Sequence, residues 1–268
     1  MSEHYPSETS PEASSQPEAQ LPTPPPPERK PQPAAWKKPD FPWVTYALVA
    51  LTVLVYIVQQ VMRRIYGLDM LFVFFGKINA GILAGELWRL LTPALLHSSL
   101  IHLMFNMYAL SMLGRQIEPF YGRGRFLMLY VLSAFGGNVL SFALSRFNSL
   151  GASTAIFGLL AAEGVFIWQN RGVFGKQSQG ILMNLAFVLV LNLFIGISPG
   201  SNTDNWGHLG GLLAGFFFAF MAGPLLVFRR VEAGARLADS RTKQQVWLGA
   251  LMVLAAFGAI AAIPFFAR

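Results

Sequence analysis

The sequence contains no cysteine and few charged residues. The lack of cysteine excludes disulfide bonds, Cys-ligated zinc and thiol catalysis. Charged residues make up 12% and hydrophobic residues 54% of the chain, whereas soluble domains carry about 25% charged residues. Several stretches of roughly 20 residues are almost free of charge, which suits a hydrocarbon core about 30 Å thick. The composition therefore predicts a protein that crosses a membrane several times.

The beginning of the chain differs in composition from the rest. Residues 1–40 are rich in Pro, Ser and Glu and poor in apolar side chains. Such a segment buries too little surface to offset the entropy lost on ordering, so we expect a disordered, Pro-rich cytoplasmic tail. It has no apolar core like that of a signal peptide. Because it carries glutamates but no arginine before Arg29, it does not fit a mitochondrial presequence either.

Seven apolar segments follow the tail and predict an all-α, polytopic membrane helix bundle. Residues 63–94, between the first two segments, are semi-apolar, and we expect a structured, partly interfacial loop with Trp88 and Arg89 at the headgroup level. The predicted spans cover approximately residues 43–62, 95–113, 125–145, 151–169, 180–197, 206–228 and 246–266.

The distribution of Lys and Arg predicts the orientation of this bundle. Of the 20 Lys and Arg residues, 14 fall on the side that holds the N-terminal tail. Cytoplasmic loops carry such an excess, so we expect a cytoplasmic N-terminus and a basic cytoplasmic linker over residues 229–245. The basic residues lie between apolar segments rather than in one patch. We therefore expect them to face the lipid bilayer, and we expect no nucleic-acid partner.

Four polar residues lie near the starts of three predicted spans. His102 and Asn106 begin the second span, Ser153 the fourth and His208 the sixth. With the N-terminus inside, even-numbered spans run from outside inward, so all four residues fall just below the outer surface. Polar groups inside a bilayer are costly and usually functional, so this common depth predicts one water-accessible site.

The residue types at this depth suit nucleophilic catalysis. A serine hydroxyl needs a base to take its proton, and the imidazole of His208 can serve Ser153 in this way. The oxyanion of a tetrahedral intermediate needs hydrogen-bond donors, which Asn106, His102 and the backbone N–H of Ser153 can supply. Gly207, Gly211 and Gly215 recur every four residues and would let the sixth span approach another helix closely.

Other catalytic designs fit the residue inventory less well. Asp204 precedes His208 and could orient its imidazole, although a two-residue Ser–His dyad is simpler. An HExxH zinc motif is missing, and the spans contain no Lys or Asp for a Ser–Lys or aspartyl dyad. Glu163 is the one plainly internal carboxylate, and we favour a structural role for it. No metal or organic cofactor is implied.

Four motifs together resemble the rhomboid family of intramembrane serine proteases. They are ELWRLLTPALLHSSLIHLMFNMYAL, LGRQIEPFYGRGRF, GASTAIFG and NWGHLGGLLAGF, within residues 86–220. The resemblance implies a six-helix core over residues 41–228 and a seventh, C-terminal helix over residues 246–268. It implies Ser153 as nucleophile and His208 as base.

The resemblance also assigns roles around this dyad. It implies that His102 and Asn106 line the oxyanion hole, and that Glu118 is a structural carboxylate. Thr154 stands where the family usually has the second glycine of a GxSG motif; we treat it as tolerated variation, although a β-branched residue constrains the backbone. The supporting residues implied by the family are Phe157, which would pack on the imidazole, and Gly151, His97, Trp88 and Arg89.

These features predict hydrolysis of peptide bonds in or near transmembrane helices of membrane-protein substrates. We expect a multi-pass protein of a bacterial inner membrane, with a cavity that opens outward beside the loop ISPGSNTDN. Two alternatives stay open. One is a non-catalytic rhomboid-like protein that binds client helices, and the other is a transporter or proton channel with His102, Asn106, His208 and Glu163 as a relay.

Overall fold

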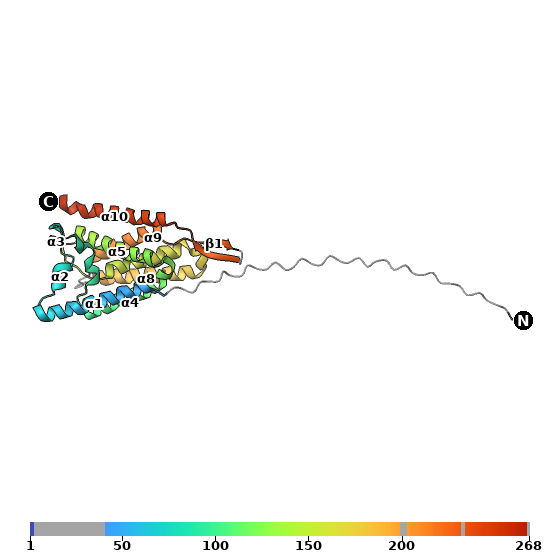
Figure 1. Cartoon of the computed structure of the whole chain (residues 1–268), viewed down its shortest axis with the longest axis horizontal. Helices are drawn as coiled ribbons and strands as arrows, with labels where there is room; N and C mark the ends of the chain where they lie inside the picture. The colour runs from blue at the N-terminus through green and yellow to red at the C-terminus, as the bar shows by residue number, and fades with distance from the viewer. Residues whose placement is uncertain (3–40, 199–202, 232–233, 267–268) are drawn as a thin grey trace.

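Among the residues that the structure describes, seven long helices form the body of the molecule, which is drawn in Figure 1. The computed structural model describes residues 1–2, 41–198, 203–231 and 234–266, so the predicted disordered tail lies almost wholly outside the described residues. The long helices are α1 (Trp43–Tyr66), α4 (Leu100–Tyr121), α5 (Arg123–Leu144), α6 (Ser153–Gln169), α8 (Gln177–Ile197), α9 (Asn205–Ala222) and α10 (Lys243–Phe266).

The helices have the character of a membrane bundle. Among the described helices, α1, α5, α8 and α10 are long and apolar enough to cross a membrane. Helix α6 is also apolar but has 17 residues, and α4 and α9 carry the polar residues singled out in the sequence. The predicted all-α, polytopic membrane fold is confirmed. The bounds of individual helices differ from the predicted spans, most clearly for α4, which continues to Tyr121.

The loop between α1 and α4 is built from four short helices. They are α2 (Met70–Phe75), α3 (Asn79–Leu83), η1 (Leu87–Leu90) and η2 (Thr92–Leu95). Arg89 is only 4% exposed, and its guanidinium donates to the carbonyl oxygens of Val73 and Gly76 at 2.8 Å each. The guanidinium of Arg89 is therefore bound by the carbonyl groups of the loop itself, and its position at the headgroup level stays a prediction. Trp88 is 48% exposed.

Glycines bring α5, α6 and α9 into direct backbone contact. A Cβ added to Gly211 on α9 would lie 1.9 Å from the carbonyl oxygen of Thr154 on α6, and one on Gly215 would lie 2.3 Å from that of Gly158. On the other side of α9, a Cβ at Gly210 would lie 2.4 Å from the carbonyl oxygen of Gly136 on α5. The predicted small-residue stripe on α9 thus packs against α6, as expected.

A carboxylate of α4 holds the start of α1. Glu118 is 3% exposed and accepts hydrogen bonds from the backbone N–H of Val44 at 2.9 Å and of Thr45 at 2.8 Å. It also accepts one from the Thr45 hydroxyl at 2.6 Å. The first N–H groups of a helix lack internal acceptors, so Glu118 caps α1 and ties it to α4.

The basic segment after α9 forms a β-hairpin. Helix α9 ends at Ala222 and is followed by Gly223 and Pro224, which cannot continue it. Strands β1 (Leu226–Val231) and β2 (Gly234–Asp239) then pair antiparallel, with Leu226 opposite Asp239. The hairpin extends from the end of the bundle where α1 begins (Figure 1). The sequence had predicted helix to residue 228 and then a linker.

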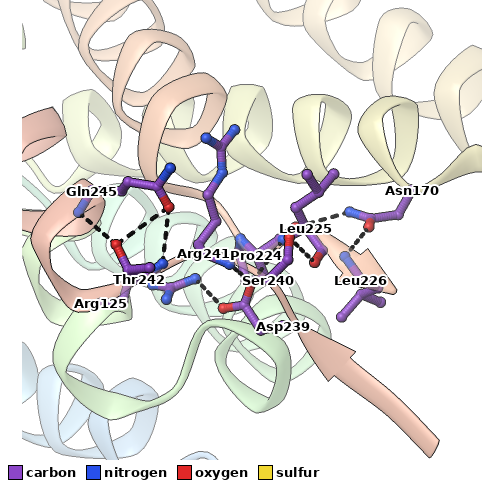
Figure 2. Close-up of polar contacts among 10 residues, drawn as sticks. All are labelled: Arg125, Asn170, Pro224, Leu225, Leu226, Asp239, Ser240, Arg241, Thr242 and Gln245. Atoms are coloured by element: carbon purple, nitrogen blue, oxygen red, sulfur yellow. Dashed lines mark hydrogen bonds and ion pairs between the residues drawn. The ribbon is translucent and has the colours of Figure 1, made fainter. Parts of the chain in front are cut away.

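A polar network fixes the base of this hairpin (Figure 2). Arg125 at the start of α5 forms an ion pair with Asp239 at 2.8 Å. Asn170, in the turn between α6 and α7 (Arg171–Phe174), donates to the carbonyl oxygen of Pro224 at 3.0 Å and accepts from the N–H of Leu226 at 2.7 Å. The hairpin therefore leaves the bundle at a defined place.

The seventh helix packs on the outside of α5 and α9. Its buried residues include Gly249, Val253 and Phe257, and a Cβ at Gly249 would lie 3.0 Å from the Cβ of Ala222 on α9. Helix α10 thus joins a core that is already formed by α5, α6 and α9, on the side away from α4 (Figure 1).

Candidate active site

The structure brings Ser153 and His208 together. Ser153 is the first residue of α6 and His208 lies in the first turn of α9. The hydroxyl Oγ of Ser153 and the ring nitrogen Nε2 of His208 lie 2.9 Å apart, which is a hydrogen-bonding distance. Two residues that are 55 positions apart meet because the glycines of α9 let its backbone approach α6. A serine and an imidazole in this contact form the pair needed for nucleophilic attack.

Phe157 fixes the plane of the imidazole. It lies one turn after Ser153 on α6, and its ring stacks on that of His208 with centroids 4.1 Å apart and an interplanar angle of 14°. Both residues are largely buried, with 6% and 8% of their surface exposed. The aromatic face therefore restricts the rotation of the imidazole and keeps Nε2 directed at Ser153. The placement of Phe157 is the one that the family resemblance implied.

Asp204 does not orient the imidazole. Its carboxylate caps α9 by accepting from the N–H of Gly207 at 2.9 Å, and its other oxygen accepts from the hydroxyl of Ser141 on α5. The Nδ1 atom of His208 has no hydrogen-bond partner among the described residues. The geometry is therefore that of a Ser–His pair, and Asp204 holds α9 against α5 instead.

Gly151 and His102 lie together beside Ser153. Gly151 has a φ of +133°, a backbone conformation that side chains disfavour, and a Cβ there would lie 2.8 Å from the His102 ring. The Nδ1 atom of His102 contacts the hydroxyl of Ser98 at 3.1 Å. Glycine is thus needed for the backbone turn into α6 and for the room that the imidazole occupies.

Donors for an oxyanion converge on the same place. Asn106 is one turn after His102 on α4 and borders the cavity; its amide donates to the carbonyl oxygen of His102 at 2.8 Å. An amide nitrogen has two hydrogens, so a second one remains for a ligand. The backbone N–H of Ser153 belongs to the first turn of α6, where helix N–H groups have no internal acceptor. These groups resemble the donor set of an oxyanion hole.

His97 supports the loop that precedes Ser153. It is fully buried, its backbone N–H donates to the side-chain oxygen of Gln59 at 3.0 Å, and its Nε2 accepts from the N–H of Ala152 at 3.5 Å. Burial lowers the pKa of His97 from 6.5 to about 3, with the neighbouring His102 acting in the same direction. A neutral His97 therefore links η2 and the start of α4 to the residue before the serine.

Lys77 is a residue of this region that the sequence reasoning missed. It is fully buried, its ammonium group donates to the carbonyl oxygen of Phe147 at 2.7 Å, and its backbone pairs with that of Ser149. Burial lowers the pKa of Lys77 to about 8, while the nearby Asp204 acts in the opposite direction. Lys77 thus tethers the first loop to the segment before Ser153. The sequence feature that could have pointed to Lys77 is its charge within an otherwise semi-apolar loop.

The remaining predicted residues lie away from the dyad. Trp88 donates from its ring N–H to the carbonyl oxygen of Phe74 at 3.0 Å, and Arg89 is bound within the same loop. Glu163 is buried on α6, and the amide of Gln116 on α4 donates to its carboxylate. These three residues hold elements together and do not reach Ser153.

A cavity of about 540 Å³ opens in front of the pair. Its lining comes from α4, α6, α8, α9 and the segment before α6, and it includes Ser153, His208, His102 and Asn106. Within the described residues, no group of three or more His, Asp or Glu is placed to hold a metal ion. Part of the loop expected beside the cavity opening, residues 199–202, lies outside the described residues.

Comparison of the sequence with known protein families and proteins agrees with this architecture. A family model described as "Rhomboid domain" matches residues 84–225. The chain is 40% identical over 186 residues to Rhomboid protease GluP of Bacillus subtilis, covering 69% of this chain and 35% of that protein. It is 34% identical over 192 residues to Rhomboid-like protease 3 of Toxoplasma gondii, covering 68% of this chain and 72% of that protein.

A plant relative matches a smaller share of this chain. RHOMBOID-like protein 1 of Arabidopsis thaliana is 34% identical over 182 residues, which cover 64% of this chain and 46% of that protein. The chain thus spans about a third to a half of the length of the Bacillus and Arabidopsis relatives. The family model nevertheless covers more than half of this chain. The matched residues include four that line the cavity, namely Ser153, His208, His102 and Asn106. The chain belongs to the rhomboid family.

Proposed function

We propose that this protein is an intramembrane serine endopeptidase that uses Ser153 and His208 as a catalytic dyad. The observation that carries the proposal is the 2.9 Å contact between Oγ and Nε2, which lies in an open cavity whose lining includes His102 and Asn106. The chain belongs to the rhomboid family, and several of its relatives carry the word protease in their names, which supports the same reaction.

In the acylation step, His208 acts as general base. Its Nε2 takes the proton of the Ser153 hydroxyl while Oγ attacks the carbonyl carbon of the substrate peptide bond. The stacked ring of Phe157 holds the imidazole at the required angle. The same nitrogen then donates its proton to the leaving amine, so the peptide bond breaks and an acyl-enzyme forms on Ser153.

The oxyanion of the tetrahedral intermediate is stabilised by nearby donors. The backbone N–H of Ser153, the amide of Asn106 and the ring of His102 face the place where this charge develops, and such donors are worth about 10²–10³-fold in rate each. In the second step, a water molecule loses a proton to His208 and attacks the acyl-enzyme. Ser153 recovers its proton when the acid product leaves.

The substrates are proposed to be transmembrane helices of other proteins. A helix in lipid keeps its carbonyl groups internally bonded, so a substrate must unwind locally before Ser153 can attack. Residues that weaken helices, and a small side chain at the cut, should therefore be preferred. We place the protein in a bacterial inner membrane. Its N-terminus is placed in the cytoplasm, because α1 begins at the end of the bundle from which the arginine-bearing hairpin extends (Figure 1), and cytoplasmic segments carry an excess of Lys and Arg.

Cleavage of defined substrates tests the proposal. The purified protein would be incubated in detergent and in liposomes with a panel of single-span membrane proteins, each with and without a helix-weakening residue in its span. We expect cut products from substrates with a weakened helix, and no products with Ser153→Ala or His208→Ala. Cleavage that persists in Ser153→Ala, or none by the wild type in either medium, would refute it.

A further inference from the structure

Thr154 occupies the position where the family usually has a glycine. It is the second residue of α6 and is 5% exposed. Its hydroxyl has no hydrogen-bond partner among the described residues. A buried hydroxyl without a partner costs free energy, so the hydroxyl does not explain the presence of threonine at this site.

The methyl side of Thr154 fits between two glycines. A Cβ added to Gly137 on α5 would lie 2.5 Å from the Cβ of Thr154 and 2.8 Å from its methyl Cγ2. A Cβ added to Gly207 on α9 would lie 3.1 Å from the same methyl. The side chain of Thr154 therefore fills the volume that these two glycines leave open where α5, α6 and α9 meet.

This contact lies one residue from the reacting pair on both helices. Thr154 directly follows Ser153, and Gly207 directly precedes His208. The backbone of α9 also touches that of Thr154, because a Cβ at Gly211 would lie 1.9 Å from its carbonyl oxygen. One side chain thus sets the separation of the two helix starts that carry Oγ and Nε2.

We infer that Thr154 is a positioning residue whose methyl group, wedged against Gly137 and Gly207, holds Ser153 and His208 at their reacting distance. The inference rests on the proposed function and extends it. Reacting groups must keep their geometry within a fraction of an ångström, and a misplacement of 1 Å can cost about 10²-fold in rate. Loss of the methyl leaves a void into which the start of α6 can relax.

Two substitutions separate the methyl from the hydroxyl. Thr154→Val keeps the shape and removes the hydroxyl, whereas Thr154→Ser keeps the hydroxyl and removes the methyl. With a single-span substrate in liposomes, we expect Thr154→Val to keep kcat within about 2-fold, and Thr154→Ser to lower kcat about 10-fold at nearly unchanged KM. Thr154→Ser should melt at a lower temperature than Thr154→Val.

Thr52 provides a matched control on α1. It is fully buried, and its hydroxyl also lacks a partner among the described residues. Thr52→Ser makes the same chemical change away from the dyad, so it should lower the melting temperature and leave kcat unchanged. This comparison separates a positioning effect from a general loss of packing.

Several results would overturn the inference. They are a wild-type kcat for Thr154→Ser, an equal loss of kcat in Thr52→Ser, or a loss in Thr154→Val as large as in Thr154→Ser. Failure of the proposed function looks different, because the wild type would then cleave no more than Ser153→Ala. In that case the melting temperatures decide the packing claim: equal values for Thr154→Ser and Thr154→Val would refute it, and a lower value for Thr154→Ser would support it.

Discussion

Two helices that border the cavity, α9 and α8, differ strongly in their packing. Half of the 18 residues of α9 are buried, including His208, and its glycines touch the backbones of α5 and α6. Helix α8 has 21 residues, of which only Gly196 is buried. It contributes Asn192 to the cavity lining and exposes Phe187 and Phe194.

The difference shows where this fold places its chemistry. The groups that must hold a fixed distance, Ser153 and His208, lie on the two helices that pack backbone to backbone. Close packing of this kind leaves few alternative arrangements. Helix α8 carries none of the proposed catalytic groups and has little burial to restrain it. The side of the cavity formed by α6 and α9, the packed wall, therefore holds its groups at fixed positions. The other wall, formed by α8, is not packed in this way.

The largest expected effect is the loss of cleavage when a serine hydroxyl is removed from the packed wall rather than from α8. Ser153→Ala removes the nucleophile from the packed wall, and we expect substrate cleavage to fall by at least about 10³-fold. Ser178→Ala makes the same change on α8, where the hydroxyl only donates to the carbonyl oxygen of Gly175 at 2.7 Å. That variant should cleave within about 2-fold of the wild type in the same liposome assay. Similar rates for both variants would contradict the comparison.

The next effect is a change in stability of opposite sign when a glycine is replaced by alanine in the packed wall and on α8. Gly211→Ala places a Cβ against the Thr154 carbonyl oxygen, and overpacking of this kind should lower the free energy of unfolding by about 2–3 kcal/mol. On α8, nothing lies within 4 Å of a Cβ at Gly180. Gly180→Ala should therefore raise stability by about 0.5–1 kcal/mol. Thermal unfolding in detergent measures both shifts, and shifts of the same sign would break the comparison.

A pH effect is expected from His97, which supports the packed wall. Its pKa falls from 6.5 to about 3 on folding, so the unfolded chain binds more protons between these values and stability falls as the pH drops below 6.5. From pH 7 to pH 5 the loss is about 2 kcal/mol, at 1.36 kcal/mol per pH unit. Unfolding measured at both pH values should show a smaller difference for His97→Gln; an unchanged difference would contradict this origin.

The smallest effect concerns α1, outside both walls. Glu118→Gln replaces a carboxylate that accepts three hydrogen bonds from α1, and we expect a loss of about 1–2 kcal/mol in unfolding free energy. The contact between α6 and α9 does not involve Glu118, so cleavage below the melting temperature should stay near the wild-type rate. A large loss of activity at unchanged stability would show that α1 influences the dyad.

The sequence predicted the packed wall better than the rest. The common depth of Ser153 and His208 and the glycine repeat of α9 were both visible, because membrane burial makes polar and small residues stand out. The structure places these groups in contact as expected. Apolar length alone identifies α1, α5, α8 and α10 as membrane-spanning helices, whereas the bounds of α4 differ from the predicted span.

Features that depend on distant partners could not be predicted. The hairpin of residues 226–239 depends on Arg125 and Asn170, which are remote in sequence. The hydrogen bonds of Arg89 could not be predicted, because nothing in the sequence shows that the carbonyl groups of Val73 and Gly76 surround it. The role of Asp204 likewise became visible only when Ser141 was seen beside it.

Labelling of the serine tests the central claim most directly. Purified protein in liposomes would react with a fluorophosphonate probe, and mass spectrometry would locate the modified residue in the wild type, in Ser153→Ala and in His208→Ala. We predict modification of Ser153 in the wild type, none at position 153 in Ser153→Ala, and strongly slowed modification in His208→Ala. Equal labelling of all three proteins, or no labelling of the wild type, would contradict the account.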